Sequence, residues 1–124
     1  MTKIEIDKLI EEGVCSSEEI NTAKKLSENL DSPEFRDRII LSEHFLKAIA
    51  DRNRIKILLL LEQGEMCVCQ LTAVTDAPQP TVSNMLRTLE MASIIKREKR
   101  GRWHYYSLME NKFVSSLMEE IRNV

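Results

Sequence analysis

The sequence predicts a mainly α-helical domain with one small β-hairpin near its C-terminal end. Apolar residues recur at helical spacing through most of the chain, which contains only three Gly and three Pro. After Ala92 the pattern changes to short runs rich in β-branched and aromatic residues on either side of Gly101, as in two strands joined by a turn. A length of 124 residues fits one domain, and a hydrophobic content of 43% is enough for a packed core.

Local start signals place the helices of the first half of the chain. The first helix is expected over residues 3 to about 13. Ser16 begins a Ser-x-x-Glu capping box, in which two side chains satisfy backbone donors at a helix start. Pro33 has the position typical of a first helical residue, and Asp51 can cap a further helix that ends near Gly64.

The second half is expected to contain three helices and the hairpin. A short helix over residues 66–74 is followed by a turn and a second helix, and the strands of the hairpin cover residues 94–97 and 102–108. A last amphipathic helix covers residues 111–124. The helix that begins after Asp51 is expected to bury Ile55, Leu58 and Leu59. The apolar residues of the two later helices are Val82, Leu86 and Leu89, and Phe113, Leu117, Met118 and Ile121.

Charge is unevenly distributed along the chain, although the net charge is only −2. Residues 1–35 contain four Lys and nine acidic residues, whereas residues 78–108 contain six Lys or Arg and two Glu. A basic segment of this kind favours an anionic partner such as nucleic acid. A solvated face with accidental clustering is the alternative that charge alone leaves open.

Polar residues of the basic half have the types and spacing of a DNA-binding surface. A short helix, a tight turn and a second helix with a polar start can place that second helix in the major groove, where its side chains reach base edges or phosphates. Cations at the hairpin tip add phosphate or minor-groove contacts, which raise affinity but carry little sequence information. The candidate DNA-binding residues are Gln79, Thr81, Ser83, Asn84, Arg87, Lys99, Arg100 and Arg102. The alternative is the same fold used only for protein contacts. The aromatic residues Trp103, Tyr105 and Tyr106 are expected to pack within the hairpin.

The number of cysteines bears on the cellular compartment. Three Cys are an odd number, too sparse for the disulfide framework of a secreted domain. No apolar run approaches the roughly 20 residues of a membrane span, and the N-terminal segment lacks the apolar core of a signal peptide. The chain is therefore expected in the cytoplasm, with reduced thiols and no membrane partner.

Cys67 and Cys69, separated by Val68, are the sharpest chemical feature. Thiolates bind soft ions such as As(III), Cd(II), Pb(II) or Zn(II). Side chains two residues apart in a regular helix point about 200° apart, so both sulfurs can face one ion only if the helix start is frayed or distorted. Two thiolates also leave a trigonal or tetrahedral ion short of donors.

Four segments of the chain carry a recognisable pattern: His44–Leu58, Glu65–Leu71, Gln79–Ser83 with Leu86 and Leu89, and Gly101–Leu108. Together they resemble the ArsR/SmtB family of winged helix-turn-helix metal-sensing repressors. The resemblance implies a homodimer that binds a palindromic double-stranded DNA operator, with its first and last helices at the dimer interface and an inducer that releases the DNA. It divides the chain into an N-terminal helical extension, residues 1–32, and a winged helix-turn-helix domain with a C-terminal dimerisation helix, residues 33–124.

The resemblance also suggests a third metal ligand. Other members of the family recruit an N-terminal Cys of the partner subunit, and Cys15 is the candidate in this chain. His44 and His104 are expected to pack or to lie at the surface rather than to bind metal. The last helix contains no His, which disfavours the other common sensor site of the family, at the dimer interface.

The sequence therefore predicts a DNA-binding transcriptional repressor that is released by a soft metal or metalloid ion at Cys67 and Cys69, with Cys15 as a further ligand. A thiol-redox-responsive regulator of the same fold that uses the same cysteines is the alternative, and purely structural cysteines are a third interpretation. No Cys-x-x-Cys, nucleotide-binding loop or His/acid constellation indicates catalysis, so an enzyme is not expected.

Overall fold

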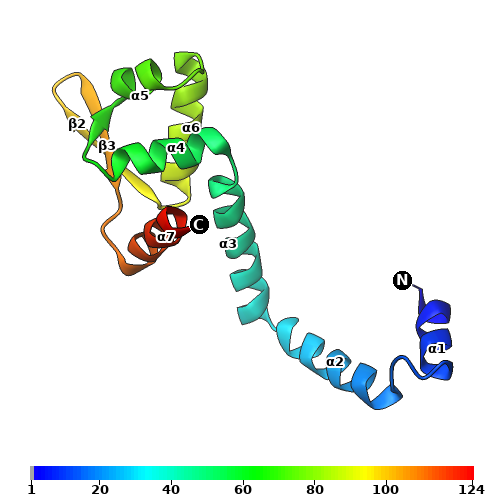
Figure 1. The fold of residues 1–124 in the computed structure, drawn as a ribbon. Helices are drawn as coiled ribbons and strands as arrows, with labels where there is room; N and C mark the ends of the chain where they lie inside the picture. The colour runs from blue at the N-terminus through cyan, green and yellow to red at the C-terminus, as the bar shows by residue number, and fades with distance from the viewer. Residues whose placement is uncertain (1) are drawn as a thin grey trace. The chain divides into compact units, whose positions relative to one another are not determined.

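A computed structural model describes residues 2–124, which form two compact units (Figure 1). The N-terminal unit is Met1–Ser42 and the winged unit is Glu43–Val124. The helix α3, Pro33–Ile49, contributes residues to both units. The boundary expected from the sequence, after residue 32, lies at the start of α3. The two compact units instead divide between Ser42 and Glu43, inside that helix.

The N-terminal unit consists of α1 (Lys3–Glu11), α2 (Ser17–Leu30) and the first part of α3. The predicted cap is present at the start of α2, where Ser16 Oγ accepts a hydrogen bond from the Glu19 amide at 3.0 Å. Thr2 caps α1 in the same way, and the Glu5 carboxylate accepts a hydrogen bond from the Thr2 amide at 2.8 Å. No residue of α1 or α2 is buried, so local caps rather than a core define these helices.

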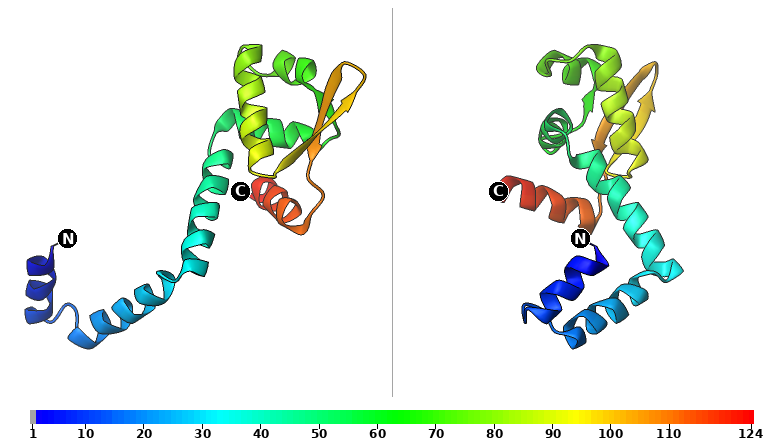
Figure 2. Two further views of the ribbon diagram at one scale, coloured as in Figure 1. Left: turned by 180° about the vertical axis from the view of Figure 1, so that it is seen from behind. Right: turned by 90° about the vertical axis from the view of Figure 1, so that its right-hand side faces the viewer.

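The winged unit contains four further helices and a small sheet. Its elements are, in chain order, α4 (Arg52–Leu61), β1 (Met66–Cys67), α5 (Val68–Val74), α6 (Gln79–Met91), β2 (Ile95–Arg100), β3 (Trp103–Leu108) and α7 (Lys112–Asn123). In Figures 1 and 2, α4, α5 and α6 gather beside the hairpin of β2 and β3, and α7 lies at the end of the hairpin away from its turn. None of the helices among residues 2–124 is long and apolar enough to cross a membrane.

The sheet has three antiparallel strands in the order β1-β3-β2. The predicted hairpin is confirmed, with Gly101 in the left-handed conformation (φ 63°) that the turn requires. The short strand β1 is an addition to the prediction. It pairs with the middle strand, so that Tyr105 lies opposite Cys67 on one side and opposite Glu98 on the other.

The hydrophobic core lies in the winged unit. It consists of Ala48, Ile57, Leu58, Leu61, Leu71, Val82, Leu86, Leu89, Ile94, Ile95, Val114 and Met118. The predicted face of α6 is confirmed in full, because Val82, Leu86 and Leu89 are all completely buried.

One prediction of a buried residue is wrong. Leu59 is 37% exposed, because α4 directs Ile57 and Leu61 into the core together with the predicted Leu58. On the apolar face of α7, Phe113 is 57% exposed, and its ring meets that of Phe45 edge-on at a centroid distance of 4.3 Å. On α7 the buried residues are Val114 and Met118.

Asp51 and Arg54 fix the junction between α3 and α4. Asp51 Oδ2 accepts a hydrogen bond from the Arg54 amide at 2.9 Å, which confirms the predicted cap. The Arg54 guanidinium in turn donates to the carbonyl oxygens of Ala48 at 2.6 Å and Lys47 at 3.0 Å. These bonds satisfy the last carbonyls of α3 and set the direction in which α4 leaves it.

Candidate DNA-binding and thiol site

The helices α5 and α6 form a helix-turn-helix. They pack against each other, with Leu71 of α5 and Leu86 of α6 in the same buried cluster. Thr75 ends α5 and is buried, and its hydroxyl donates to the Leu71 carbonyl at 2.9 Å. The helix α6 then begins at Gln79, and Pro80 lies in its first turn, where a missing amide hydrogen breaks no helical bond.

The polar candidates on α6 lie away from the core. Gln79, Thr81, Asn84 and Arg87 are exposed, and Ser83 is half-buried. At about 100° per residue, Asn84 and Arg87 project from the side of α6 opposite to Val82 and Leu89. Arg87 Nη1 donates to Asn84 Oδ1 at 3.4 Å, so the two side chains that best suit base or phosphate contacts adjoin each other.

Several cations of the basic segment are already paired with carboxylates. Lys96 Nζ lies 3.7 Å from Glu110 Oε1, and Arg97 Nε lies 3.6 Å from Glu90 Oε2. Arg100 is paired most closely, with two carboxylates. Within residues 2–124, no ion pair involves Arg87, Lys99 or Arg102, which are exposed cations on α6 and at the hairpin tip.

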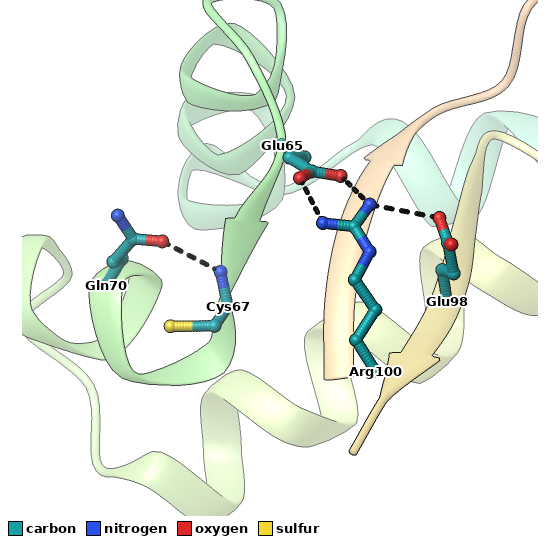
Figure 3. Close-up of polar contacts among 5 residues, drawn as sticks. All are labelled: Glu65, Cys67, Gln70, Glu98 and Arg100. Carbon is teal, nitrogen blue, oxygen red and sulfur yellow. Dashed lines mark hydrogen bonds and ion pairs between the residues drawn. The ribbon is translucent and has the colours of Figure 1, made fainter. Parts of the chain in front are cut away.

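Arg100 binds two carboxylates from different parts of the chain. Its Nη1 and Nη2 atoms lie 2.6 and 2.7 Å from the two oxygens of Glu65, and Nη2 also lies 3.1 Å from Glu98 Oε2 (Figure 3). The guanidinium lies over the Tyr105 ring, 4.8 Å from its centroid. Hydrogen bonds from Arg100 lower the pKa of the Glu65 carboxyl, and the same bonds raise the pKa of Arg100.

The aromatic residues of the hairpin behave differently from one another. Tyr105 and Tyr106 are half-buried, as expected for hairpin packing. The packing role expected for Trp103 is wrong, because its side chain is 52% exposed at the start of β3.

The two neighbouring cysteines span a strand–helix junction. The helix expected from residue 66 begins at Val68, and Cys67 is its extended N-cap residue, with φ −86° and ψ 167°. Because Cys67 lies outside the helix, the separation of about 200° between side chains two residues apart in a regular helix does not apply to Cys67 and Cys69. The Cys67 amide donates to Gln70 Oε1 at 2.9 Å, and in Figure 3 its sulfur points to the side of Gln70, away from Arg100.

The donor set suits a soft ion but does not complete its coordination. Cys67 is half-buried and Cys69 exposed, and all three cysteines are free thiols. Cys15, in the N-terminal unit between α1 and α2, is also half-buried. Among residues 2–124, no three His, Cys, Asp or Glu side chains are grouped closely enough to hold a metal ion. The residues fit as a thiolate pair that needs at least one further donor.

Sequence reasoning missed two features of this region. It did not find β1, and it assigned Arg100 to DNA without its partner Glu65. No local signal links these two residues, which are 35 positions apart.

The comparison with known proteins now identifies the family. The model of the bacterial regulatory proteins of the arsR family matches residues 51–97, the segment from α4 into β2. The arsenical resistance operon repressor of Bacillus subtilis is 36% identical over 80 residues, which cover 64% of this chain and 76% of the repressor. The chain belongs to the arsR family. The family assignment made from the sequence is therefore confirmed.

Other relatives and solved structures agree with this assignment. The cadmium resistance regulatory protein CadC of Listeria innocua is 31% identical to this arsR-family chain over 103 residues, 82% of the chain and 80% of CadC. The homodimeric winged helix-turn-helix DNA-binding domain of Mb0332 from Mycobacterium bovis has a TM-score of 0.67 at 25% identity, over 74% of this chain and 84% of that domain. HlyU of Vibrio cholerae, at 23% identity over 69% of this chain and 92% of its own, shows the same fold with a TM-score of 0.63.

The family assignment fixes the general function. This protein is a winged helix-turn-helix DNA-binding transcriptional regulator, with β2 and β3 as the wing. Its relatives are regulators rather than enzymes, in agreement with the expectation from the sequence.

Proposed function

We propose that this regulator is a homodimeric repressor that binds a palindromic double-stranded DNA operator and is released by a soft metal or metalloid ion at Cys67 and Cys69. The candidate ions are As(III), Cd(II), Pb(II) and Zn(II). One observation carries the proposal: the two thiols lie on either side of the junction between β1 of the wing sheet and α5 of the helix-turn-helix. The names of the arsenical and cadmium resistance relatives support this class of inducer.

The DNA side of the proposal uses the exposed polar surface of α6 and the wing. Five residues of α6 contact base edges in the major groove or orient the helix there: Gln79, Thr81, Ser83, Asn84 and Arg87. At the hairpin tip, Lys99 and Arg102 bind phosphate or enter the minor groove. The homodimer is supported by the homodimeric Mb0332 domain and by exposed apolar residues of the winged unit, including Leu46 and Phe113.

The thiol side of the proposal follows from what holds each sulfur. A bound soft ion supplies a link between two thiolates. Cys67 is fixed by the pairing of β1 with β3, whereas Cys69 belongs to the first turn of α5. We propose that binding of an ion between the two sulfurs pulls the first turn of α5 relative to the sheet, and α6 packs on α5. Release requires that the ion bind the form with low DNA affinity more tightly than the other form.

Cys15 is proposed as the further thiolate, from the same or the partner subunit. It supplies the third soft donor that the pair lacks. A second candidate function is a thiol-redox regulator in which Cys67, Cys69 or Cys15 is oxidised, because all three cysteines are free thiols.

Both candidates are tested by DNA release from the wild type and three Ser variants. An operator is first selected from random-sequence DNA, and As(III), Cd(II), Pb(II) and Zn(II) are then titrated into the complex under reducing conditions. At least one ion should release wild type, while Cys67→Ser and Cys69→Ser should bind DNA normally and resist release. Resistance of Cys15→Ser identifies the third ligand.

Two outcomes decide between the candidates. If no ion lowers the DNA affinity of the reduced protein, the metal proposal is wrong. If peroxide then releases the DNA and thiol labelling shows loss of free Cys67 or Cys69, the redox function takes its place.

A further inference from the structure

The Arg100 cluster, comprising Arg100, Glu65, Glu98 and Tyr105, connects all three strands of the sheet. Arg100 and Glu98 belong to β2, Tyr105 to β3, and Glu65 directly precedes β1. The guanidinium crosses the Tyr105 ring of the middle strand and reaches the Glu65 carboxylate with both Nη atoms. One side chain therefore ties the far edge of the wing to the segment that leads into Cys67.

The strand β1 needs such support, because it is only two residues long. Its ladder consists of Met66 opposite Tyr106 and Cys67 opposite Tyr105. A two-residue edge strand has few backbone bonds to hold it, so a bidentate Arg–carboxylate contact beside it adds to its attachment. Glu65 lies two residues before Cys67, whose half-buried side chain directs its sulfur to the side of Gln70, away from Arg100 (Figure 3).

The charges of the cluster also argue against a DNA contact by Arg100. Both Nη atoms already donate to carboxylate oxygens, and two carboxylates face one guanidinium. A phosphate would therefore compete with Glu65 and Glu98 for the donors of Arg100. Lys99 and Arg102, which flank Arg100 and the turn, have no such partner within residues 2–124.

We propose that Arg100 is a positioning residue, which holds the wing on the cysteine strand and transmits the state of Cys67 to the wing, rather than a DNA contact. The positioning role stands on the geometry alone, whereas the transmission rests on the proposed function of the thiols. Binding at Cys67 and DNA binding through the wing are then linked, and each changes the other by the same factor.

The first test measures operator affinity as a function of salt for six variants. Glu65→Gln and Arg100→Gln should each weaken binding several-fold, and the double variant should be no weaker than either, because both remove the same contact. Glu65→Gln is the sharper variant, since it removes a negative charge and would tighten binding if only charge mattered. The salt slope should stay at the wild-type value in Arg100→Gln and fall by about one unit in the matched cation control Arg102→Gln.

The positioning role is overturned by a specific pattern. If Arg100→Gln lowers the salt slope by about one unit and Glu65→Gln tightens binding, Arg100 contacts phosphate. Glu98→Gln serves as the carboxylate control, because it removes a single contact at 3.1 Å and not the bidentate pair. Arg100→Lys keeps the positive charge but cannot make the bidentate contact with Glu65. It replaces Arg100→Gln if that variant does not fold, and it should weaken DNA binding as much as Glu65→Gln does.

A second test needs neither DNA nor metal. Hydrogen exchange of the amides in β1 and β3 should be faster in Glu65→Gln than in wild type, whereas exchange in α6 should be unchanged. Unchanged exchange in both strands would overturn the positioning role.

The third test concerns transmission. The ratio of DNA affinities without and with the releasing ion should fall towards one in Glu65→Gln, while the ion still binds the thiols with the wild-type stoichiometry. A wild-type ratio in Glu65→Gln overturns the transmission. If wild type is released by no ion, the proposed thiol function fails and transmission fails with it, and the salt and exchange measurements still decide the positioning role.

Discussion

The two compact units of this chain contain equally regular helices but differ in what stabilises them. In the winged unit, α4, α6 and α7 each direct buried side chains into one core. In the N-terminal unit, α1 and α2 have capped starts and amphipathic sequences, and yet neither buries a residue. Periodicity and caps therefore predict a helix correctly in both units, but they do not reveal whether that helix has anything to pack against.

This difference separates local from cooperative stability. Isolated helices as short as α1 and α2 have marginal stability in water, because the few hydrogen bonds they form barely offset the unfavourable nucleation step. The helices of the winged unit are stabilised in addition by apolar burial, at about 25 cal/mol per Å². Substitutions of the same chemical kind should consequently have unequal effects in the two units.

The largest contrast is expected for matched Leu→Ala substitutions. Leu86 on α6 is completely buried, so Leu86→Ala should lower the free energy of unfolding by about 2–5 kcal/mol. Leu26 on α2 is 61% exposed, and Leu26→Ala should stay within about 0.5 kcal/mol of wild type. Urea unfolding followed by circular dichroism at one fixed protein concentration measures both. A loss for Leu26→Ala as large as that for Leu86→Ala would contradict the contrast.

A smaller contrast is expected for helix caps. Asp51 caps α4 and Ser16 caps α2, each through a side-chain oxygen bonded to a backbone amide. Removal of a cap costs its helix about 1 kcal/mol. Asp51→Ala should shift the cooperative thermal transition downward, and Asp51→Asn should restore most of the shift. Ser16→Ala should lower the helical signal before the transition without moving its midpoint. A midpoint shift in Ser16→Ala equal to that in Asp51→Ala would show that α2 unfolds together with the core.

The features predicted from the sequence are those with a local physical cause. Ser16, Pro33 and Asp51 mark helix starts because their side chains or rings act within one turn. Gly101 marks the hairpin because the turn needs a positive φ. The polar face of α6 followed from residue types at helical spacing, and those residues are exposed or half-buried as a reading helix requires.

The features that could not be predicted depend on distant partners. The face of α4 is ambiguous because Ile57 to Leu61 are all apolar, so only tertiary contacts decide that Leu59 is exposed. The strand β1 exists because residues of β3 pair with it, and its two residues carry no periodic signal. The ion pair of Arg100 with Glu65 could not be predicted, because the charge of Arg100 is visible in the sequence and its distant partner is not.

The smallest expected effect is a local change in the winged unit at acidic pH, where the contact between Glu65 and Arg100 weakens. Arg100 lowers the pKa of Glu65 below its ordinary value of 4.5. A carboxyl with a lower pKa in the folded than in the unfolded state stabilises the fold above its unfolded pKa, and this stabilisation is lost as the pH falls through the folded pKa. The attachment of β1 to the wing should therefore weaken below about pH 4.5. The single tryptophan, Trp103, lies on β3 and should report this change through its emission.

Two variants separate this local response from general acid unfolding. Glu65→Gln should lack the emission change below pH 4.5, because no carboxyl remains to be protonated. Glu43→Gln is the matched control: hydrogen bonding to Lys47 also lowers the pKa of Glu43, but this pair lies on α3. The emission change of the Glu43→Gln variant below pH 4.5 should equal that of wild type. If the emission of Glu65→Gln changes with pH as that of wild type does, Trp103 reports acid unfolding of the whole winged unit. The local weakening proposed for the Arg100 cluster would then be contradicted.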